Sequence, residues 1–274
     1  MEKFNVDNTK CCRDGFCAGE CPFGLLNMED EGGFPNMKPE LEPYCMECGH
    51  CVAVCPHNAV EISGIPKAGC LEVKKEMSLS PEQAEHFVRG RRSVRFFKED
   101  KIDQQTILKL IELARYAPTA HNTETVQWTV ITDKEKLYNL SAKSIDWMRN
   151  VLETSPSIPN ANIFQAIINR WDMGKDPILR NGPVLVVASS PREDQNGLVD
   201  CTIALTTLEL VAPTVGIGGF WAGLLNNALL NSSEILQYIG IPKGHTRFYP
   251  MILGPPKYQY HRMPERKTPM VFWQ

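Results

Sequence analysis

The sequence predicts an α+β protein in two parts: a small cysteine-rich N-terminal unit and a larger domain of helices and strands. Eight of the ten cysteines lie between Cys11 and Cys55, which sets this region apart from the rest of the chain. Beyond residue 80 the chain carries helix start signals and apolar runs of strand length instead. The predicted division is residues 1–63, a linker over 64–79, and a second domain over 80–274.

The composition argues against several classes of protein. The 274 residues contain 29 Lys and Arg against 32 Asp and Glu, whereas nucleic-acid binders normally carry a basic excess. The N-terminus is polar and mixed in charge, unlike a signal peptide. The longest apolar stretch, residues 198–230, is interrupted by Pro213 and several glycines, unlike a membrane span. We therefore expect a cytoplasmic protein that binds neither nucleic acid nor a membrane.

The cysteine-rich unit is an internal repeat with an offset of 34 residues. Asp14 falls on Cys48, so the first copy has a carboxylate where the second has a thiol. An apolar segment of strand length follows each cysteine run, and EDEGG between the copies is a turn signal. Residues 1 to about 62 are thus predicted to be two copies of one loop-and-strand unit. Apart from Cys12, which falls on Met46, the offset superimposes the remaining cysteines of this region in three pairs: Cys11 and Cys45, Cys17 and Cys51, and Cys21 and Cys55.

The second cysteine run has the spacing C-x2-C-x2-C-x3-C-P, from Cys45 to Cys55. Three closely spaced thiolates can bind three irons of one cubane cluster, while the fourth cysteine reaches another cluster. Zinc is the alternative metal, but it takes four ligands from two cysteine pairs rather than from such runs. Over residues 4–63 the pattern resembles the bacterial two-cluster ferredoxins.

The ferredoxin resemblance implies two 4Fe-4S clusters and a ligand set for each. One cluster would be held by four thiolates, those of Cys21, Cys45, Cys48 and Cys51. The other would be held by Cys11, Cys17 and Cys55, with a fourth ligand that the pattern leaves open.

Asp14 is the favoured fourth ligand, because the repeat places it there and some archaeal ferredoxins are similar in carrying aspartate at this position. Cys12 is the alternative, but it lies two residues away and would require the loop to bend. A third interpretation has Asp14 solvated and Cys12 as a spare thiol. A carboxylate is a harder ligand than a thiolate. If Asp14 is the fourth ligand, we therefore expect the iron that it binds to be lost easily, which would leave a 3Fe-4S cluster.

Helix signals open the larger domain. Ser80 is a predicted N-cap, followed by Pro81 at the first helical position and Gln83 in a capping box; Gly90 is placed to end this helix. A second helix is predicted from an Asp103 cap to Pro118. Its apolar face carries Ile107, Leu110, Ile111 and Ala114.

Later elements are predicted from apolar runs. Strands are expected over residues 127–132, 184–189 and 247–253. A helix over 198–215 is apolar nearly all round, which suits burial between subunits.

A cationic loop, RGRRSVRFF, lies between the first two helices. Alone it would be interpreted as a solvated basic turn, although guanidinium groups beside a hydroxyl also suit a phosphate. Three motifs follow in order: APTAHN at 117–122, GIGGFWAG at 216–223 and YHRMPERK at 260–267. In order and spacing the four motifs resemble the FMN-dependent nitroreductase family over residues 80–274.

The nitroreductase resemblance implies an FMN site. Arg95 would lie near the pyrimidine edge, where a cation stabilises reduced flavin, and Arg180 is a weaker candidate. The phosphate would be held by Arg91, Arg92 and Ser93, with Arg262 closing over it. The partner subunit's flavin would be reached by Pro118, Thr119, Ala120 and Asn122. The isoalloxazine ring would lie along Trp221, Ala222 and Gly223.

The two resemblances together imply a ferredoxin-like iron-sulfur domain followed by a nitroreductase-like α+β domain with a central mixed sheet flanked by helices. The nitroreductase resemblance further implies a tight homodimer whose C-terminal PMVFWQ adds a strand to the partner's sheet. Residues 133–180 carry no family motif, and we expect them to shape the substrate pocket. Glu124 and Thr125 depart from the family's usual Gln-Pro, and GPP from its usual GYP.

These features together predict an oxidoreductase that passes electrons from a donor through two iron-sulfur clusters to FMN and then to a small organic acceptor, such as a nitro compound or quinone. The donor is expected to be a ferredoxin or NAD(P)H; the absence of a G-x-G-x-x-G fingerprint does not exclude NAD(P)H in this family. The alternatives are an NAD(P)H nitroreductase with auxiliary clusters and a redox sensor or electron-transfer adaptor. No catalytic acid or base is assigned.

Overall fold

The computed structural model describes residues 2–28, 33–65 and 67–274. The chain forms two compact units. The first unit contains residues 1–78 and the short segment Ala120–Thr123, and the second contains the remaining residues from 79 to 274. Most of the segment predicted as a linker therefore groups with the first unit.

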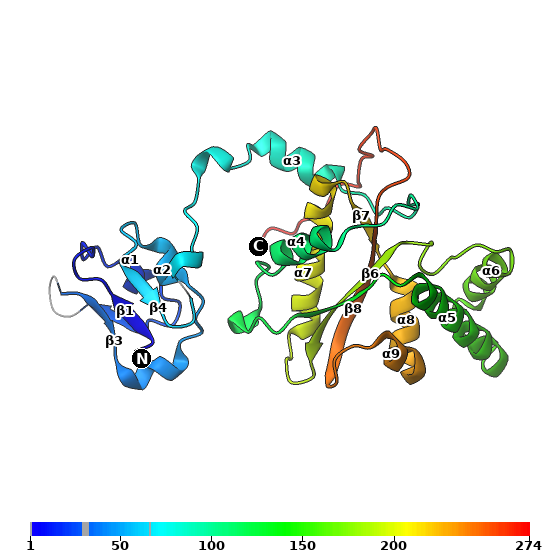
Figure 1. The fold of residues 1–274 in the computed structure, drawn as a ribbon, viewed down its shortest axis with the longest axis horizontal. Helices are drawn as coiled ribbons and strands as arrows, with labels where there is room; N and C mark the ends of the chain where they lie inside the picture. Colours follow the sequence, from blue (N-terminus) through cyan, green and yellow to red (C-terminus); the bar gives the residue numbers. More distant parts are fainter. Residues whose placement is uncertain (1, 29–32, 66) are drawn as a thin grey trace. The chain divides into compact units, whose positions relative to one another are not determined.

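The first unit contains two short helices and two antiparallel strand pairs (Figure 1). Strand β1 (Phe4–Val6) pairs with β4 (Val60–Ile62), and β2 (Leu26–Met28) pairs with β3 (Pro35–Met37). Its core combines apolar side chains with two thiols: Phe4, Cys17, Leu26, Cys51, Val60 and Ile62 are buried. The helices are α1 (Phe16–Glu20) and α2 (His50–Val54), and the 3-10 helix η1 (Pro39–Tyr44) precedes α2.

The 34-residue repeat is present in the backbone. Helix α1 maps onto α2, and β2 maps onto β4, at this offset. Residues with left-handed backbone also repeat at the same offset. They are Arg13 and Glu47 (φ 64° and 52°), Gly15 and Gly49 (φ 73° and 74°), and Gly24 and Asn58 (φ 60° and 50°). The predicted EDEGG turn lies outside the described residues, apart from Gly33.

Two 3-10 turns, η2 (Lys67–Gly69) and η3 (Lys75–Met77), follow β4. The second unit then begins with α3 (Pro81–Gly90), whose predicted capping box is confirmed. Gln83 N–H donates to Ser80 Oγ at 3.2 Å, and Ser80 N–H donates to the Gln83 side-chain oxygen at 2.9 Å.

The second unit is built on a four-stranded sheet in the order β5-β6-β8-β7. All three neighbouring pairs are antiparallel. The predicted mixed sheet is wrong for these strands, and parallel pairing is limited, in the described residues, to the bridge between Ser93 and Gly219. Apolar runs in the sequence could not reveal this, because a buried strand has the same apolar pattern whether it pairs parallel or antiparallel to its neighbour. The strands are β5 (Gln127–Ile131), β6 (Val184–Pro191), β7 (Gly218–Trp221) and β8 (His245–Gly254).

Helices cover both faces of this sheet (Figure 1). Helix α4 (Gln104–Ala114) and helix α7 (Gly197–Val211) pack on one face. As predicted, Asp103 caps α4 through Thr106 N–H, and Ile107, Leu110 and Ala114 are buried. The opposite face is covered by α5 (Lys134–Thr154), α6 (Ala161–Asp172), α8 (Gly223–Asn231) and α9 (Ser233–Ile239).

Helix α7 continues into the 3-10 turn η5 (Ala212–Val215). By length and composition alone this 19-residue stretch, with a mean hydropathy of 1.5, could cross a membrane. However, Cys201, Leu205 and Leu208 have no exposed surface and pack with β6 and β8 in one core cluster. We therefore interpret this stretch as the core helix of the second unit. Its burial against the sheet explains why it is apolar nearly all round.

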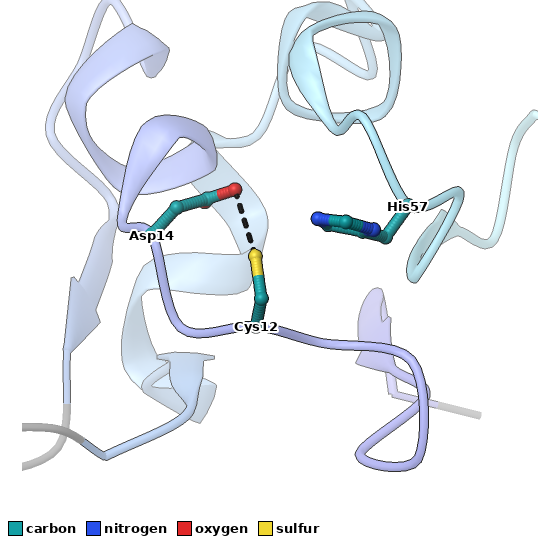
Figure 2. Close-up of side chains that lie close together, drawn as sticks. All are labelled: Cys12, Asp14 and His57. Carbon is teal, nitrogen blue, oxygen red and sulfur yellow. Dashed lines mark hydrogen bonds between the residues drawn. The ribbon is translucent and has the colours of Figure 1, made fainter.

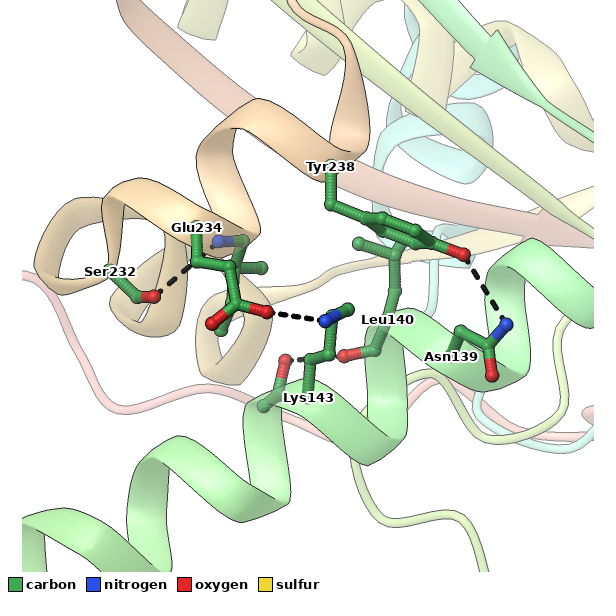
Figure 3. A network of polar contacts seen from close by, with 8 residues as sticks. Asn139, Leu140, Lys143, Ser232, Glu234 and Tyr238 are labelled. Atoms are coloured by element: carbon green, nitrogen blue, oxygen red, sulfur yellow. Dashed lines mark hydrogen bonds and ion pairs between the residues drawn. The ribbon is translucent and has the colours of Figure 1, made fainter.

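Polar contacts hold α5 against α9 (Figure 3). Lys143 of α5 pairs with Glu234 of α9, and Asn139 Nδ2 lies 3.3 Å from Tyr238 Oη. Ser232 caps α9 by accepting from Ile235 N–H at 3.4 Å. These contacts help to fix α5, whose first residues line a cavity described below.

Candidate functional site

Four thiols of the first unit line one cavity: those of Cys21, Cys45, Cys48 and Cys51. They are the four ligands that the ferredoxin-like spacing assigns to a single cluster. The rest of the wall is largely apolar and includes Leu26, Met37 and Ile62. Burial, followed by the charges of Cys45 and Cys48, raises the pKa of Cys51 to about 12. Soft sulfur donors in an apolar wall fit an iron-sulfur cluster.

Backbone amides point at two of the predicted ligands. Leu25 N–H donates to Cys21 Sγ at 3.4 Å, and Ala59 N–H donates to Cys55 Sγ at 3.3 Å. The two bonds are related by the 34-residue repeat. Hydrogen bonds to the sulfurs are one means by which proteins set cluster potentials. Both loops therefore have the same local support for a ligand thiolate.

The first cysteine loop places Asp14 beside a group of thiols. Burial raises the pKa of Cys17, and the charges of Cys11, Cys55 and Asp14 raise it further. Asp14 is flanked by left-handed residues at positions 13 and 15, just as Cys48 is flanked at 47 and 49. This geometry favours Asp14 over Cys12 at the fourth position, and the assignment stays a prediction.

Cys12 and His57 both lie beside Asp14 (Figure 2). Cys12 Sγ donates to Asp14 Oδ2 at 3.2 Å, and this bond is the main reason that the pKa of Cys12 is raised. One ligand atom from each of the three exposed residues lies within 4.8 Å of the others. Sequence reasoning missed His57, although its place two residues after Cys55 puts it next to the first cluster position.

We expect Asp14→Cys to raise the iron content of air-exposed protein from about seven to about eight atoms per chain. A thiolate is a softer ligand than a carboxylate and should retain the corner iron. Iron and sulfide analysis of anaerobic and air-exposed samples measures this. If Cys12→Ser lowers the iron content while Asp14→Cys leaves it unchanged, Cys12 is the ligand and the Asp14 assignment fails.

The predicted anion loop is attached to the edge of the second unit's sheet. Val94 N–H donates to Gly219 O at 2.8 Å, directly after the Ser93 bridge. A Cβ atom at Gly218 would lie 2.3 Å from Val94 Cγ2, and one at Gly219 would lie 2.7 Å from the carbonyl oxygen of Ile252. The glycine-rich motif thus permits close approach of the loop and of β8.

Two of the predicted flavin residues contact Glu209 of α7, and a third contacts Arg91. Arg91 Nη1 donates to Glu209 Oε1 at 2.8 Å, and the Trp221 indole N–H donates to the other oxygen at 2.9 Å. Ser93 Oγ lies 3.4 Å from Arg91 Nη1. Glu209 is only 5% exposed, so its carboxylate fixes both donors within the protein.

Glu209 was missed because the helix was treated as apolar nearly all round. The available signal was an acid within an apolar helix, since a buried carboxylate normally has a partner. The structure thus supplies a residue that positions the proposed phosphate-binding arginine.

The remaining flavin candidates in this unit are more dispersed. Ala222 is buried and donates its N–H to Pro250 O at 3.0 Å, whereas Gly223 is exposed at the start of α8. Arg92 is half-buried and Arg262 is exposed. A Cβ on Gly90 would lie 3.6 Å from the Met263 side chain, so the segment that carries Arg262 passes beside the start of the anion loop.

The segment predicted to reach the partner's flavin is divided between the two units. Pro118 and Thr119 belong to the second unit, and Thr119 Oγ1 accepts from Glu124 N–H at 3.1 Å. Ala120 and Asn122 belong to the first unit, where Asn122 Nδ2 lies 3.3 Å from the carbonyl oxygens at positions 46 and 47, next to Cys48. Their roles toward a flavin stay predictions.

Thr125, one departure from the family pattern, has a structural role. Its hydroxyl donates to Asp194, which also accepts from Ser190 Oγ at 3.0 Å. The bond from Thr125 is the main reason that the pKa of Asp194 is lowered. The Thr125 hydroxyl therefore links the segment before β5 to the loop after β6. The proline that is usual in the family has no hydroxyl and could not make this bond.

Arg95 lines a different place from Arg91 and Ser93. It borders a cavity of about 710 Å³ together with Arg180, and its guanidinium carbon lies 6.0 Å from the centre of the Phe220 ring. The segment predicted to shape a substrate pocket, residues 133–180, contributes to the same wall through α5 and α6.

The sequence profile of the Nitroreductase family matches residues 88–254. The chain belongs to the nitroreductase family. The match covers the anion loop, Glu209 and Trp221, and it confirms the predicted nitroreductase-like oxidoreductase. A protein of Archaeoglobus fulgidus with the provisional name NADH dehydrogenase/NAD(P)H nitroreductase is 26% identical over 176 residues, which are 64% of this chain and 87% of that protein.

Solved structures share the fold of this nitroreductase-family protein. The nitroreductase of Bacteroides fragilis, a structure with bound FMN, superposes with a TM-score of 0.58 at 19% identity and covers 70% of this chain and 99% of its own. This likeness confirms the α+β fold. The polyferredoxin protein MvhB of Methanothermus fervidus is 32% identical over 83 residues, which are 29% of this chain but only 18% of that relative.

Proposed function

We propose that this nitroreductase-family protein is an iron-sulfur flavoprotein that passes electrons from a donor through two clusters to FMN and on to a small organic acceptor. The observation that best supports this proposal is that Cys21, Cys45, Cys48 and Cys51 line one cavity in a chain of the nitroreductase family. Iron-sulfur clusters carry single electrons, and flavins exchange one or two. The two halves therefore suit one electron-transfer chain.

The proposed cluster ligands follow the repeat. Cys21, Cys45, Cys48 and Cys51 hold one cluster in the cavity that they line. The other uses Cys11, Cys17 and Cys55, with Asp14 at the corner beside Cys12 and His57. The partial identity with a polyferredoxin supports clusters rather than zinc.

The proposed FMN site starts from Arg91 and Ser93, which present a guanidinium and a hydroxyl to the phosphate. Glu209 orients Arg91 and the Trp221 indole, so the loop is preorganised before cofactor binds. The FMN bound to the Bacteroides fragilis relative supports this cofactor. Arg92 and Arg262 add positive charge, and Ala222 and Gly223 allow the ring to approach the backbone. We also propose a cytoplasmic homodimer in which residues 118–122 approach the partner's flavin.

The first test is the composition of protein purified without oxygen. About eight irons, eight sulfides and one FMN per chain are expected, or about seven irons if the Asp14 corner is empty. Stopped-flow spectra should then show cluster reduction by dithionite or ferredoxin followed by flavin reduction. Zinc without sulfide would refute the clusters, and reduced clusters that never reduce the flavin would refute the electron-transfer chain.

An NAD(P)H nitroreductase with auxiliary clusters is the second candidate. It is favoured by the name of the Archaeoglobus fulgidus relative. In that case NAD(P)H should reduce the flavin directly and at the same rate whether or not the clusters are present.

A further inference from the structure

The cavity beside Arg95 has a strongly cationic wall. Its volume of about 710 Å³ suits a small molecule, since ligand pockets commonly span roughly 300–1,000 Å³. Among the residues that the structure describes, only two acids line it, Glu99 and Asp176. Seven cations line it: Arg95, Lys98, Lys134, Arg170, Lys175, Arg180 and Lys257.

Asp176 is engaged by the protein backbone. One of its oxygens accepts from the N–H groups of Ile178 and Leu179, at 2.9 and 3.0 Å, and the other accepts from Asn181 N–H at 2.9 Å. The carboxylate thus shapes the turn that presents Arg180. Its charge also acts on Arg180, where it raises the pKa, so it compensates part of the positive charge of the wall.

Arg180 is the most constrained cation of this wall. It is half-buried, whereas the other six cations of the wall are exposed. Burial lowers the pKa of Arg180, the nearby charges of Arg170 and Arg95 lower it further, and the charge of Asp176 acts in the opposite direction. The backbone is left-handed at Arg180 and Asn181, with φ of 58° and 52°. Such strain persists where the surrounding structure holds a side chain in place.

The cavity also offers apolar surface. Lys134 is the first residue of the 21-residue helix α5, but the positive end of this helix is already capped by Asp133, which accepts from Lys136 N–H at 2.7 Å. Phe96, Leu137 and Leu179 add apolar contacts, and Tyr138 adds an aromatic ring. A ligand with a ring and one or more acidic groups would match both parts of the wall.

We propose that the electron acceptor of this protein is an anionic small molecule, a ring compound carrying carboxylate, sulfonate or phosphate, held in this pocket. The inference rests on the proposed function, which assigns the FMN phosphate to the separate Arg91–Ser93 loop. Residues 95–99 of the wall follow that loop directly in the chain, so acceptor and cofactor sites adjoin. A quinone acceptor would take two electrons and two protons to become a hydroquinone, with reduced FMN as reductant and solvent supplying the remaining proton.

The test uses the full-length flavin-loaded protein, reduced by light and EDTA without oxygen. It is mixed with 1,4-naphthoquinone-2-sulfonate or with neutral 2-methyl-1,4-naphthoquinone, and flavin reoxidation gives a second-order rate for each. We compare the wild type with Arg170→Glu/Lys175→Glu. The control is Lys101→Glu/Lys109→Glu, which makes the same change in net charge at exposed residues outside the pocket.

In the Arg170→Glu/Lys175→Glu variant, the rate of flavin reoxidation by the anionic quinone, divided by the rate with the neutral quinone, should fall about tenfold at low salt. This effect should shrink in high salt. The control should leave the ratio within about twofold. An equal ratio in all three proteins would overturn the proposal. If the pocket variant loses FMN during ultrafiltration, the cations serve the cofactor, and the proposal also fails. Wild type that binds no FMN would instead refute the proposed function.

Discussion

Replacing Cys48 and Cys51 with serine should remove one cluster, lower the iron content by about four atoms per chain and leave FMN bound. Both thiols line the four-cysteine cavity, and serine hydroxyls are poor ligands for iron at this site. Because electrons would no longer reach the flavin through this cluster, flavin reduction by reduced ferredoxin should fall at least about a hundredfold. Iron analysis, flavin absorbance and stopped-flow spectra measure the three effects.

The matched control is Cys70→Ser, an exposed thiol outside both cysteine loops. It should leave iron, flavin and electron transfer unchanged. Undiminished turnover of the double variant with NAD(P)H would show that the clusters are auxiliary and would favour the second candidate function. Iron that stays at the wild-type level would show that the ligand assignment is wrong.

Replacing Arg91 with methionine should weaken FMN binding about ten- to a hundredfold, as expected for losing a charge-assisted hydrogen bond to phosphate. It should also lower the free energy of unfolding by about 2 kcal/mol, because Glu209 is left buried without its cation. This value is below the roughly 3–5 kcal/mol of a fully buried pair, since the Arg91 side chain is 25% exposed. Flavin titration and urea unfolding of the metal-loaded protein measure the two effects.

The double variant Arg91→Met/Glu209→Gln separates folding from binding. Glutamine still offers an oxygen to the Trp221 indole but carries no charge, so stability should largely return while FMN binding stays weak. Arg89→Met is the control, because Arg89 pairs with Glu85 on an exposed helix face. Wild-type FMN affinity in Arg91→Met would contradict the phosphate role of Arg91.

Local features of this protein were predictable from its sequence. The 34-residue offset in the cysteine runs appears in the backbone as equivalent helices, strands and left-handed residues. The caps at Ser80 and Asp103 form as predicted, and the apolar runs at 127–132, 184–189 and 247–253 form β5, β6 and β8. These features depend on residues close together in the chain, so spacing alone specifies them.

The candidate site was predictable only in part. Order and spacing of the motifs identified Arg91, Ser93 and Trp221; the structure brings Arg91 and Trp221 to one carboxylate, and Ser93 contacts Arg91. That carboxylate, Glu209, is 118 residues from Arg91 along the chain, and no local pattern links the two. His57 was missed although it lies two residues after Cys55; contact between the two halves of the repeat brings it beside Asp14.

The sequence by itself determined the repeat, the cysteine spacing, the helix starts and the family motifs, because each is a relation between near neighbours or an ordered set of short segments. Tertiary structure alone decided the antiparallel direction of the sheet, the partner of Arg91 and the gathering of seven cations around one cavity. Those features depend on which distant segments pack together. Burial strengthens the Arg91–Glu209 pair, whereas six of the seven cavity cations are exposed and act through their number.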